Sequence, residues 1–174
     1  MWLLLWLLHQ PPALGYTLLT REAMIASYFP GAERVESVRF VPSAAAAAAL
    51  AAELGAPLPQ AGYEILVGWS GGAPAGYAIV DEQLGQHEPI TYAVLFDPAG
   101  RVQRVEIMVY REPYGDGVRS EGFRRQFVGR DASSPMRAGR EIQFVSGSTI
   151  SSRALAAGVR RDALLIRAYL QQAM

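Results

Sequence analysis

The residues with the clearest chemical potential form a small, hydroxyl-rich turn near the C-terminus of the 174-residue chain. The turn is Ser146-Gly147-Ser148-Thr149, and the segment after it carries apolar residues at helical spacing. The first turn of a helix leaves backbone N–H groups without partners and carries the positive end of the helix dipole. Because glycine also lets a ligand approach the backbone, the turn is a candidate phosphate-binding site. A serine-rich helix cap without a ligand would account for the same residues.

Two other sets of polar residues permit different chemistry. His87 is the only histidine that follows the N-terminal segment 1–15, and no second ligand stands at metal-binding spacing from it. A serine hydrolase with Ser146 or Ser148 as its nucleophile would need the glycine-flanked elbow between a strand and a helix, which the sequence lacks. We therefore expect neither metal ligands nor catalytic residues.

The composition excludes several functional classes. The chain has 16 basic and 16 acidic residues, and all of the basic residues are arginine. The balanced charge argues against nucleic acid as a partner, and the absence of lysine excludes a Schiff base and a P-loop lysine. The chain contains no cysteine, so it forms no disulfide and supplies no thiolate to a metal or an iron–sulfur cluster.

The N-terminal segment is apolar but short. Residues 1–8 contain only Met, Trp and Leu, whereas a helix that crosses a bilayer needs about 20 apolar residues. Ala13-Leu14-Gly15 has the small-residue pattern of a cleavage site, although no basic residue precedes the apolar run. We interpret residues 1–15 as a possible signal peptide or short apolar leader and residues 16–174 as a single domain. A short interfacial anchor and a wrongly assigned start codon are the alternatives.

The rest of the pattern predicts an α+β fold. Strands are expected over residues 35–41, 63–69, 75–81, 91–96 and 102–109. Helices are expected over residues 16–28, 44–54 and 121–128 and behind the 146–149 turn. The last four strands form two hairpins of one antiparallel meander. We expect this meander to pack against the helices, with the C-terminal helix presenting its N-terminus to a phosphate.

The hydroxyl-rich turn also resembles a known motif. Ser146-Gly147-Ser148-Thr149 is similar to the SGAT tetrad of the FMN-binding domain family, which includes the flavin-carrying subunits of Rnf complexes and of the sodium-pumping NADH:quinone reductase. The similarity continues through residues 150–154 and 158–160. Ser148 stands where the family often has Ala, and Gln143 stands where it usually has an acidic residue.

A second stretch resembles the same family. Residues 110–117 are similar to its Glu-x-Pro-Gly loop, with Tyr114 inserted where Gly would stand. Glu112 is carried over as a cofactor-binding residue. We expect Tyr114 and Tyr110 to lie against the isoalloxazine ring, because a glycine-flanked loop presents its side chains at the surface.

The resemblance implies FMN as the cofactor, joined through its phosphate to Thr149 as a phosphoester that a dedicated flavin transferase installs. It implies binding roles for Ser146, Gly147 and Ser148 beside Thr149. A flavin passes electrons singly or in pairs. The implied protein is therefore a periplasmic or extracytoplasmic membrane-associated electron carrier, or a subunit that serves the redox partner proteins of a membrane electron-transfer complex, rather than a stand-alone enzyme. The alternative is a non-catalytic binding or assembly module that holds FMN noncovalently or has lost it.

Overall fold

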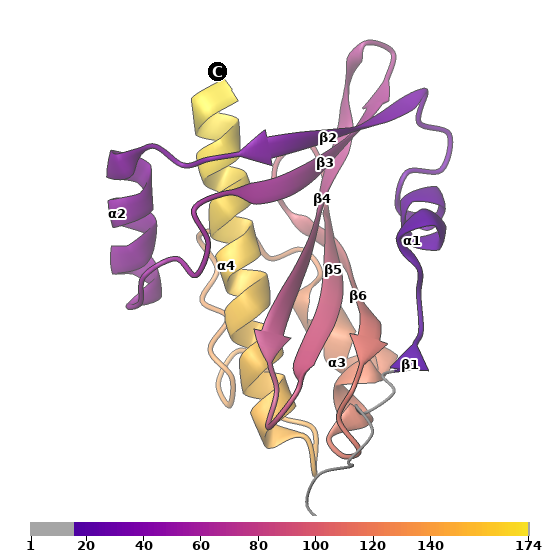
Figure 1. Ribbon diagram of the computed structural model, residues 1–174, viewed down its shortest axis with the longest axis vertical. Coiled ribbons are helices and arrows are strands. Elements are labelled where there is room, and N and C mark those ends of the chain that lie inside the picture. The colour runs from indigo at the N-terminus through magenta and orange to yellow at the C-terminus, as the bar shows by residue number, and fades with distance from the viewer. Residues whose placement is uncertain (1–15, 174) are drawn as a thin grey trace, which may run out of the picture.

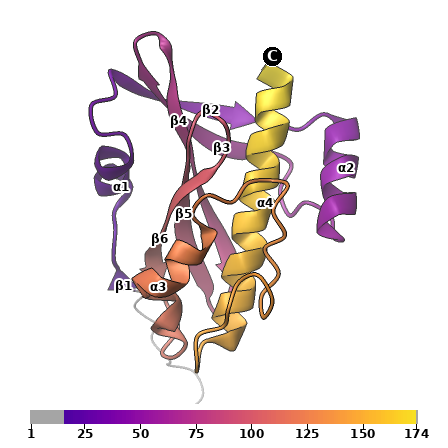
Figure 2. The same cartoon turned by 180° about the vertical axis from the view of Figure 1, so that it is seen from behind.

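The computed structural model describes residues 16–173 as one antiparallel sheet with helices on both faces (Figures 1 and 2). The strands are β1 (Tyr16–Thr17), β2 (Arg34–Phe40), β3 (Tyr63–Ser70), β4 (Ala73–Leu84), β5 (Pro89–Phe96) and β6 (Val102–Tyr110). The helices are α1 (Arg21–Tyr28), α2 (Ala44–Leu54), α3 (Glu121–Arg124) and α4 (Thr149–Ala173), with short 3-10 turns η1 (Asp116–Arg119) and η2 (Arg125–Phe127). The predicted α+β class is confirmed.

The sheet is a meander in which β2 to β6 lie beside one another in chain order. β1 pairs with the outer edge of β6, which gives the strand order β1-β6-β5-β4-β3-β2. The β3–β4 hairpin turns at Gly71 and Gly72, whose φ angles of 59° and 75° are unfavourable for other residues. Both predicted hairpins are confirmed, and β4 extends beyond its predicted end to Leu84.

The helix predicted over residues 16–28 is wrong in its first part. Thr20 is the N-cap of α1, because its side-chain oxygen accepts the N–H of Ala23 at 3.2 Å. The residues before it pair as β1 with Val109 and Tyr110 of β6. Residues 16–17 thus pair with the edge of β6 as a strand, and the helix begins only after Thr20.

The helix predicted over residues 121–128 is also shorter than expected. It begins at the predicted position, where Ser120 Oγ accepts the N–H of Phe123 at 3.4 Å. It then tightens into η2 and ends before Gly129, whose φ is 80°. Phe123 and Phe127 are both buried, with their rings edge to face at 5.6 Å between centroids.

α4 and α1 lie on opposite sides of the sheet (Figures 1 and 2). The predicted apolar face of α4 is buried, and Leu155, Val159 and Ile166 are fully shielded from solvent. Burying each such side chain contributes roughly 1.5–3 kcal/mol to stability. On the other face, Met24 and Tyr28 of α1 pack against the sheet in a smaller cluster. The larger core therefore fixes α4, the helix whose N-terminus was predicted to bind phosphate.

α2 lies beside α4 and is held there by charge. Its predicted bounds are confirmed, with Ser43 at its N-cap and Gly55 in the left-handed conformation at its end. Arg160 donates to the Glu53 carbonyl at 2.9 Å, and Arg167 forms an ion pair with the Glu53 carboxylate. Arg160 and Arg167, which lie seven residues apart on α4, therefore both bind Glu53 of α2.

Within residues 16–173, no helix combines the length and the hydropathy required to cross a membrane. The expected leader of residues 1–15 lies outside the residues that the structure describes. The N-terminal end of α4 lies at the same end of the molecule as the turn between β4 and β5 (Figure 1).

Candidate functional site

The hydroxyl-rich turn has the backbone geometry that a phosphate requires. Gly147 has a φ of 75°, and a Cβ built on it would meet no atom within 4 Å. The first hydrogen bond of α4 runs from the N–H of Ser152 to the carbonyl of Ser148 at 2.8 Å. The N–H groups of residues 149–151 consequently have no intrahelical acceptor, and no other bond occupies them in the described part of the chain. Open space in front of these donors can hold an anion.

Burial separates the hydroxyl groups of this turn into two kinds. Ser148 is buried, and its Oγ accepts the N–H of Gly117 at 3.1 Å. Ser152 is fully buried and donates its hydroxyl to the Ser148 carbonyl at 2.7 Å. Ser146 and Thr149 are exposed, and among residues 16–173 neither hydroxyl has a hydrogen-bond partner. Within the tetrad of residues 146–149, Ser146 and Thr149 are therefore the residues that present a free hydroxyl group to solvent.

The loop after β6 is held against the start of α4 by Tyr110. Its phenol donates to the Tyr114 carbonyl at 2.8 Å and lies 3.2 Å from Ser151 Oγ. Because the single phenolic hydrogen is used on Tyr114, Ser151 donates to Tyr110. A Cβ on Gly115 would lie 2.9 Å from Ser151 Oγ, so only glycine fits between the loop and the helix.

The two tyrosines of this loop have different roles. Tyr114 is 81% exposed, which agrees with its predicted surface position. Tyr110 is 2% exposed, so the prediction that its ring lies against the isoalloxazine is wrong. It is the last residue of β6, and its ring points into the core instead of belonging to the loop.

Glu112 lies behind the site instead of inside it. Its Oε1 accepts the backbone N–H groups of His87 at 2.7 Å and of Glu88 at 3.1 Å. Burial opposes the charge of Glu112, but these N–H groups prevail and hold its pKa below the ordinary value. A Cβ on Gly85 would lie 2.6 Å from the same oxygen. Glu112 therefore holds the β4–β5 turn in place and does not line the cavity described below, and its role in binding the cofactor stays a prediction.

The residues that fit the phosphate line one cavity of about 230 Å³. The lining is Gln86, Tyr114, Gly115, Gly147, Ser148, Thr149, Ile150 and Ser151. Four predicted residues meet here: Tyr114, Gly147, Ser148 and Thr149. Ser146 adjoins the cavity in sequence but does not line it. The open space in front of the unpaired N–H groups fits a phosphate, and exposed Tyr114 at the rim can meet an attached aromatic ring.

Sequence reasoning missed Gln86 and Ile150. Gln86 enters the cavity from the β4–β5 turn, where only the neighbouring His87 was considered as a possible ligand. His87 uses its backbone N–H on Glu112, and residues 16–173 contain no group of three side chains that could hold a metal. Ile150 is 46% exposed in the structure, and the only signal for it in the sequence is its position directly after the tetrad.

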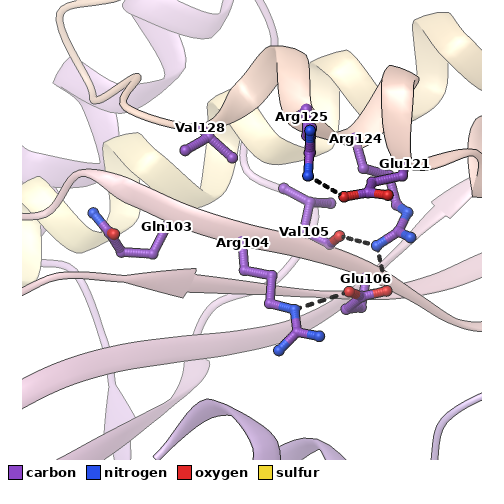
Figure 3. Close-up of a pocket in the computed structure, with 8 residues that line it drawn as sticks. All are labelled: Gln103, Arg104, Val105, Glu106, Glu121, Arg124, Arg125 and Val128. Carbon is purple, nitrogen blue, oxygen red and sulfur yellow. Dashed lines mark hydrogen bonds and ion pairs between the residues drawn. The ribbon is translucent and has the colours of Figure 1, made fainter.

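A larger hollow, of about 650 Å³, lies between β6 and α3 (Figure 3). Its charged side chains are occupied by one another. Arg104 pairs with Glu106 at 2.9 Å, Arg125 pairs with Glu121 at 2.5 Å, and Arg124 bridges the Val105 carbonyl and Glu106. No residue of the hydroxyl-rich turn reaches this hollow. We therefore place the candidate site at the smaller cavity.

Comparison with known proteins supports the same region. Residues 85–163 match the model of the FMN-binding domain, and this segment spans the β4–β5 turn, the loop after β6 and the start of α4. No curated protein matches the chain in sequence. The crystal structure of Shewanella oneidensis NqrC superposes with a TM-score of 0.56, covering 87% of this chain and 89% of that chain at 11% sequence identity. At this identity the likeness establishes a shared fold.

Proposed function

Because residues 85–163 form an FMN-binding domain whose cofactor is FMN, we propose that this protein is an electron carrier with FMN joined to Thr149 as a phosphoester. When bound, FMN supplies a ring that accepts and releases electrons singly or in pairs. The chain itself holds the phosphate, presents the ring and leaves it accessible to partners.

One observation carries this proposal, namely that Thr149 has an exposed hydroxyl at the first position of α4. The ester requires Thr149 Oγ1 to displace a leaving group from the phosphorus of an activated flavin phosphate, with loss of the hydroxyl proton. Oγ1 forms no hydrogen bond within residues 16–173 that must first be broken. The adjacent N–H groups of residues 149–151 would then face the phosphate oxygens, where the helix dipole favours negative charge.

The same exposure supports the proposed partners. A flavin transferase has to reach the acceptor hydroxyl, and redox partner proteins have to approach the ring. Thr149 and Tyr114 are both exposed at one end of the molecule. We place the protein in the periplasm or on the extracytoplasmic side of a membrane, as part of an electron-transfer complex, on the basis of the family resemblance and the apolar residues 1–8. A module that binds FMN noncovalently, or has lost it, is the alternative.

The test is to coexpress the protein with a flavin transferase and precipitate it with acid. Wild-type protein should retain flavin, and mass spectrometry should locate it on the peptide that contains Thr149. Thr149→Ala should lose covalent flavin completely, because no hydroxyl remains at the acceptor position. Ser146→Ala is the matched control, since Ser146 has the other exposed hydroxyl of the tetrad, and it should keep the ester.

Three outcomes would count against the proposal in different ways. Ester-linked flavin in Thr149→Ala would move the acceptor to another hydroxyl. A wild-type protein that is yellow but releases its flavin on precipitation would favour the noncovalent module. A colourless wild-type protein would favour an assembly role without cofactor.

A further inference from the structure

The cavity that receives the phosphate contains no cationic side chain. Its eight lining residues are all uncharged, and the first turn of α4, which forms part of the lining, supplies only the partial positive charge of the helix dipole. A phosphate ester of FMN keeps a negative charge at neutral pH. Backbone N–H groups and a helix dipole contribute modestly at an exposed position. A cation that lies just outside the lining would therefore add substantially to phosphate binding.

Arg153 stands at the required position. It follows Thr149 by one turn of α4, so the two side chains share one face of the helix. Side chains on a helix lean toward its N-terminus, which directs the long Arg153 side chain back toward Thr149. Arg153 is exposed, and the ester would form on the same exposed face.

The guanidinium of Arg153 is held in place by an aromatic ring. It lies 5.2 Å from the ring centroid of Phe144, which precedes the hydroxyl-rich turn. Phe144 rests in turn on Gly139, where an added Cβ would approach its ring to 2.8 Å. The cation is thus oriented by its neighbours although its surroundings are exposed to solvent.

Arg153 also retains its full charge for a ligand. Among residues 16–173, it forms no ion pair with a carboxylate and no side-chain hydrogen bond. Arg160 and Arg167, which follow it along the polar face of α4, are both engaged with Glu53 of α2. Of these three evenly spaced arginines, Arg153 is the one whose side chain forms neither a hydrogen bond nor an ion pair within residues 16–173.

We infer that Arg153 is the cation that recognises the flavin phosphate, and that it makes the site select FMN over riboflavin. The inference rests on the proposed function. Arg153 acts here as a specificity residue, and Phe144 acts as the residue that positions it. Guanidinium binding to a phosphate oxygen is a charge-assisted hydrogen bond, which is stronger than a neutral one.

The test compares two ligands that differ only in the phosphate. Protein expressed without a flavin transferase is titrated with FMN and with riboflavin, and binding is followed by flavin fluorescence. Arg153→Gln should raise the Kd for FMN about 10-fold, the effect of one charge-assisted hydrogen bond. The same variant should leave the Kd for riboflavin unchanged. Arg153→Lys should fall between wild type and Arg153→Gln, because it keeps the charge but loses the planar fork.

Arg140→Gln is the matched control for loss of one positive charge. Arg140 is exposed in the loop before α4, and its side chain also has no ion pair in the described part of the chain. This variant should bind FMN as wild type does.

Two results for Arg153→Gln would overturn the assignment while leaving FMN binding by the wild-type protein intact. The variant would bind FMN and riboflavin with equally reduced affinity, or its affinity for both ligands would be unchanged. Failure of the wild-type protein to bind FMN, with or without transferase, would instead contradict the proposed function on which the assignment rests.

Discussion

Tyr110 illustrates how a single buried hydroxyl can join two parts of a binding site. Its phenol connects the Tyr114 carbonyl on the loop after β6 with Ser151 on α4. Burial raises the pKa of Tyr110, so the phenol stays protonated and keeps donating at physiological pH. The position of the exposed Tyr114 ring therefore depends on a buried residue that does not line the cavity.

Tyr110→Phe should loosen the loop without unfolding the protein. The ring still fills the core, and the loss of the hydrogen bond should cost about 1 kcal/mol of unfolding free energy. Chemical denaturation measures that cost, and the fluorescence anisotropy of attached flavin should fall as the loop becomes mobile. Tyr63→Phe is the control, since its hydroxyl is also buried but has no partner among residues 16–173. Identical anisotropy in wild type and Tyr110→Phe would show that the bond does not order the site.

For single residues, the sequence predicts several that line the candidate cavity but does not predict which of their polar atoms are free. The tetrad identified Thr149 by resemblance, whereas the occupied hydroxyl of Ser148 depends on the N–H of Gly117. Gly117 is 31 positions away along the chain. The hydrogen bonds of Glu112 were unpredictable for the same reason, because its partners lie on the β4–β5 turn. Contacts between distant loops leave no local pattern in a sequence.

At the scale of elements, the proposed function depends on the N-terminus of α4 and the turn that precedes it. Gly147→Val should sharply reduce the amount of bound FMN per folded protein. Valine resists the positive φ of 75°, and its side chain would fill the open space where the phosphate approaches. Ser148→Ala should lose only about 1 kcal/mol of stability, the value of its bond to Gly117, and should retain flavin.

Gly55→Val provides the control for backbone strain in this experiment. Gly55 ends α2 with a φ of 71° and also has no atom within 4 Å of an added Cβ. It lies away from the cavity, so it should show the strain without the loss of FMN. Flavin absorbance measures the occupancy of each variant, and circular dichroism confirms folding. Full occupancy in folded Gly147→Val would remove this turn from the phosphate site.

Elements with their own capping residues were the most predictable. Ser43 and Gly55 bracket α2 in the sequence as they do in the structure. Thr20 caps α1 in the structure, whereas the predicted helix of residues 16–28 included it, because two-residue β1 carries no periodic signal. β1 exists through pairing with β6, and such an edge contact is decided by the assembled sheet.

For the whole molecule, the sequence predicts the meander and its helices but not the polar cluster between them. Asp81 of β4 and Arg161 of α4 form an ion pair of 2.6 Å that is almost completely buried. Asp162 is fully buried beside them, and neither of its oxygens has a hydrogen-bond partner within residues 16–173. Tyr92 of β5, also fully buried, borders the same cluster. Alternation of apolar residues cannot reveal charges that lie between a helix and a sheet.

The charges of this cluster do not balance if both acids are ionised. Arg161 supplies one positive charge, and it already pairs with Asp81. Burial raises the pKa of Asp162 well above its ordinary value, and the charge of Asp81 raises it further against the opposing effect of Arg161. Asp162 therefore holds its proton to a higher pH in the folded protein than in the unfolded chain.

This protonation should make the folded protein less stable as pH rises. An acid with a raised folded pKa binds more protons in the folded state, so its stabilising contribution is complete below an unfolded pKa of about 4 and declines above it. The decline is at most about 1.4 kcal/mol per pH unit for one proton. Asp162→Asn removes the titrating group at nearly constant volume. The unfolding free energy of this variant relative to wild type should therefore increase as pH rises from 4 toward 8. Urea denaturation across this range measures the difference, with the exposed Asp116→Asn as control. Parallel curves for wild type and Asp162→Asn would mean that Asp162 has the same pKa in both states, and the cluster would then hold two ionised acids around one arginine.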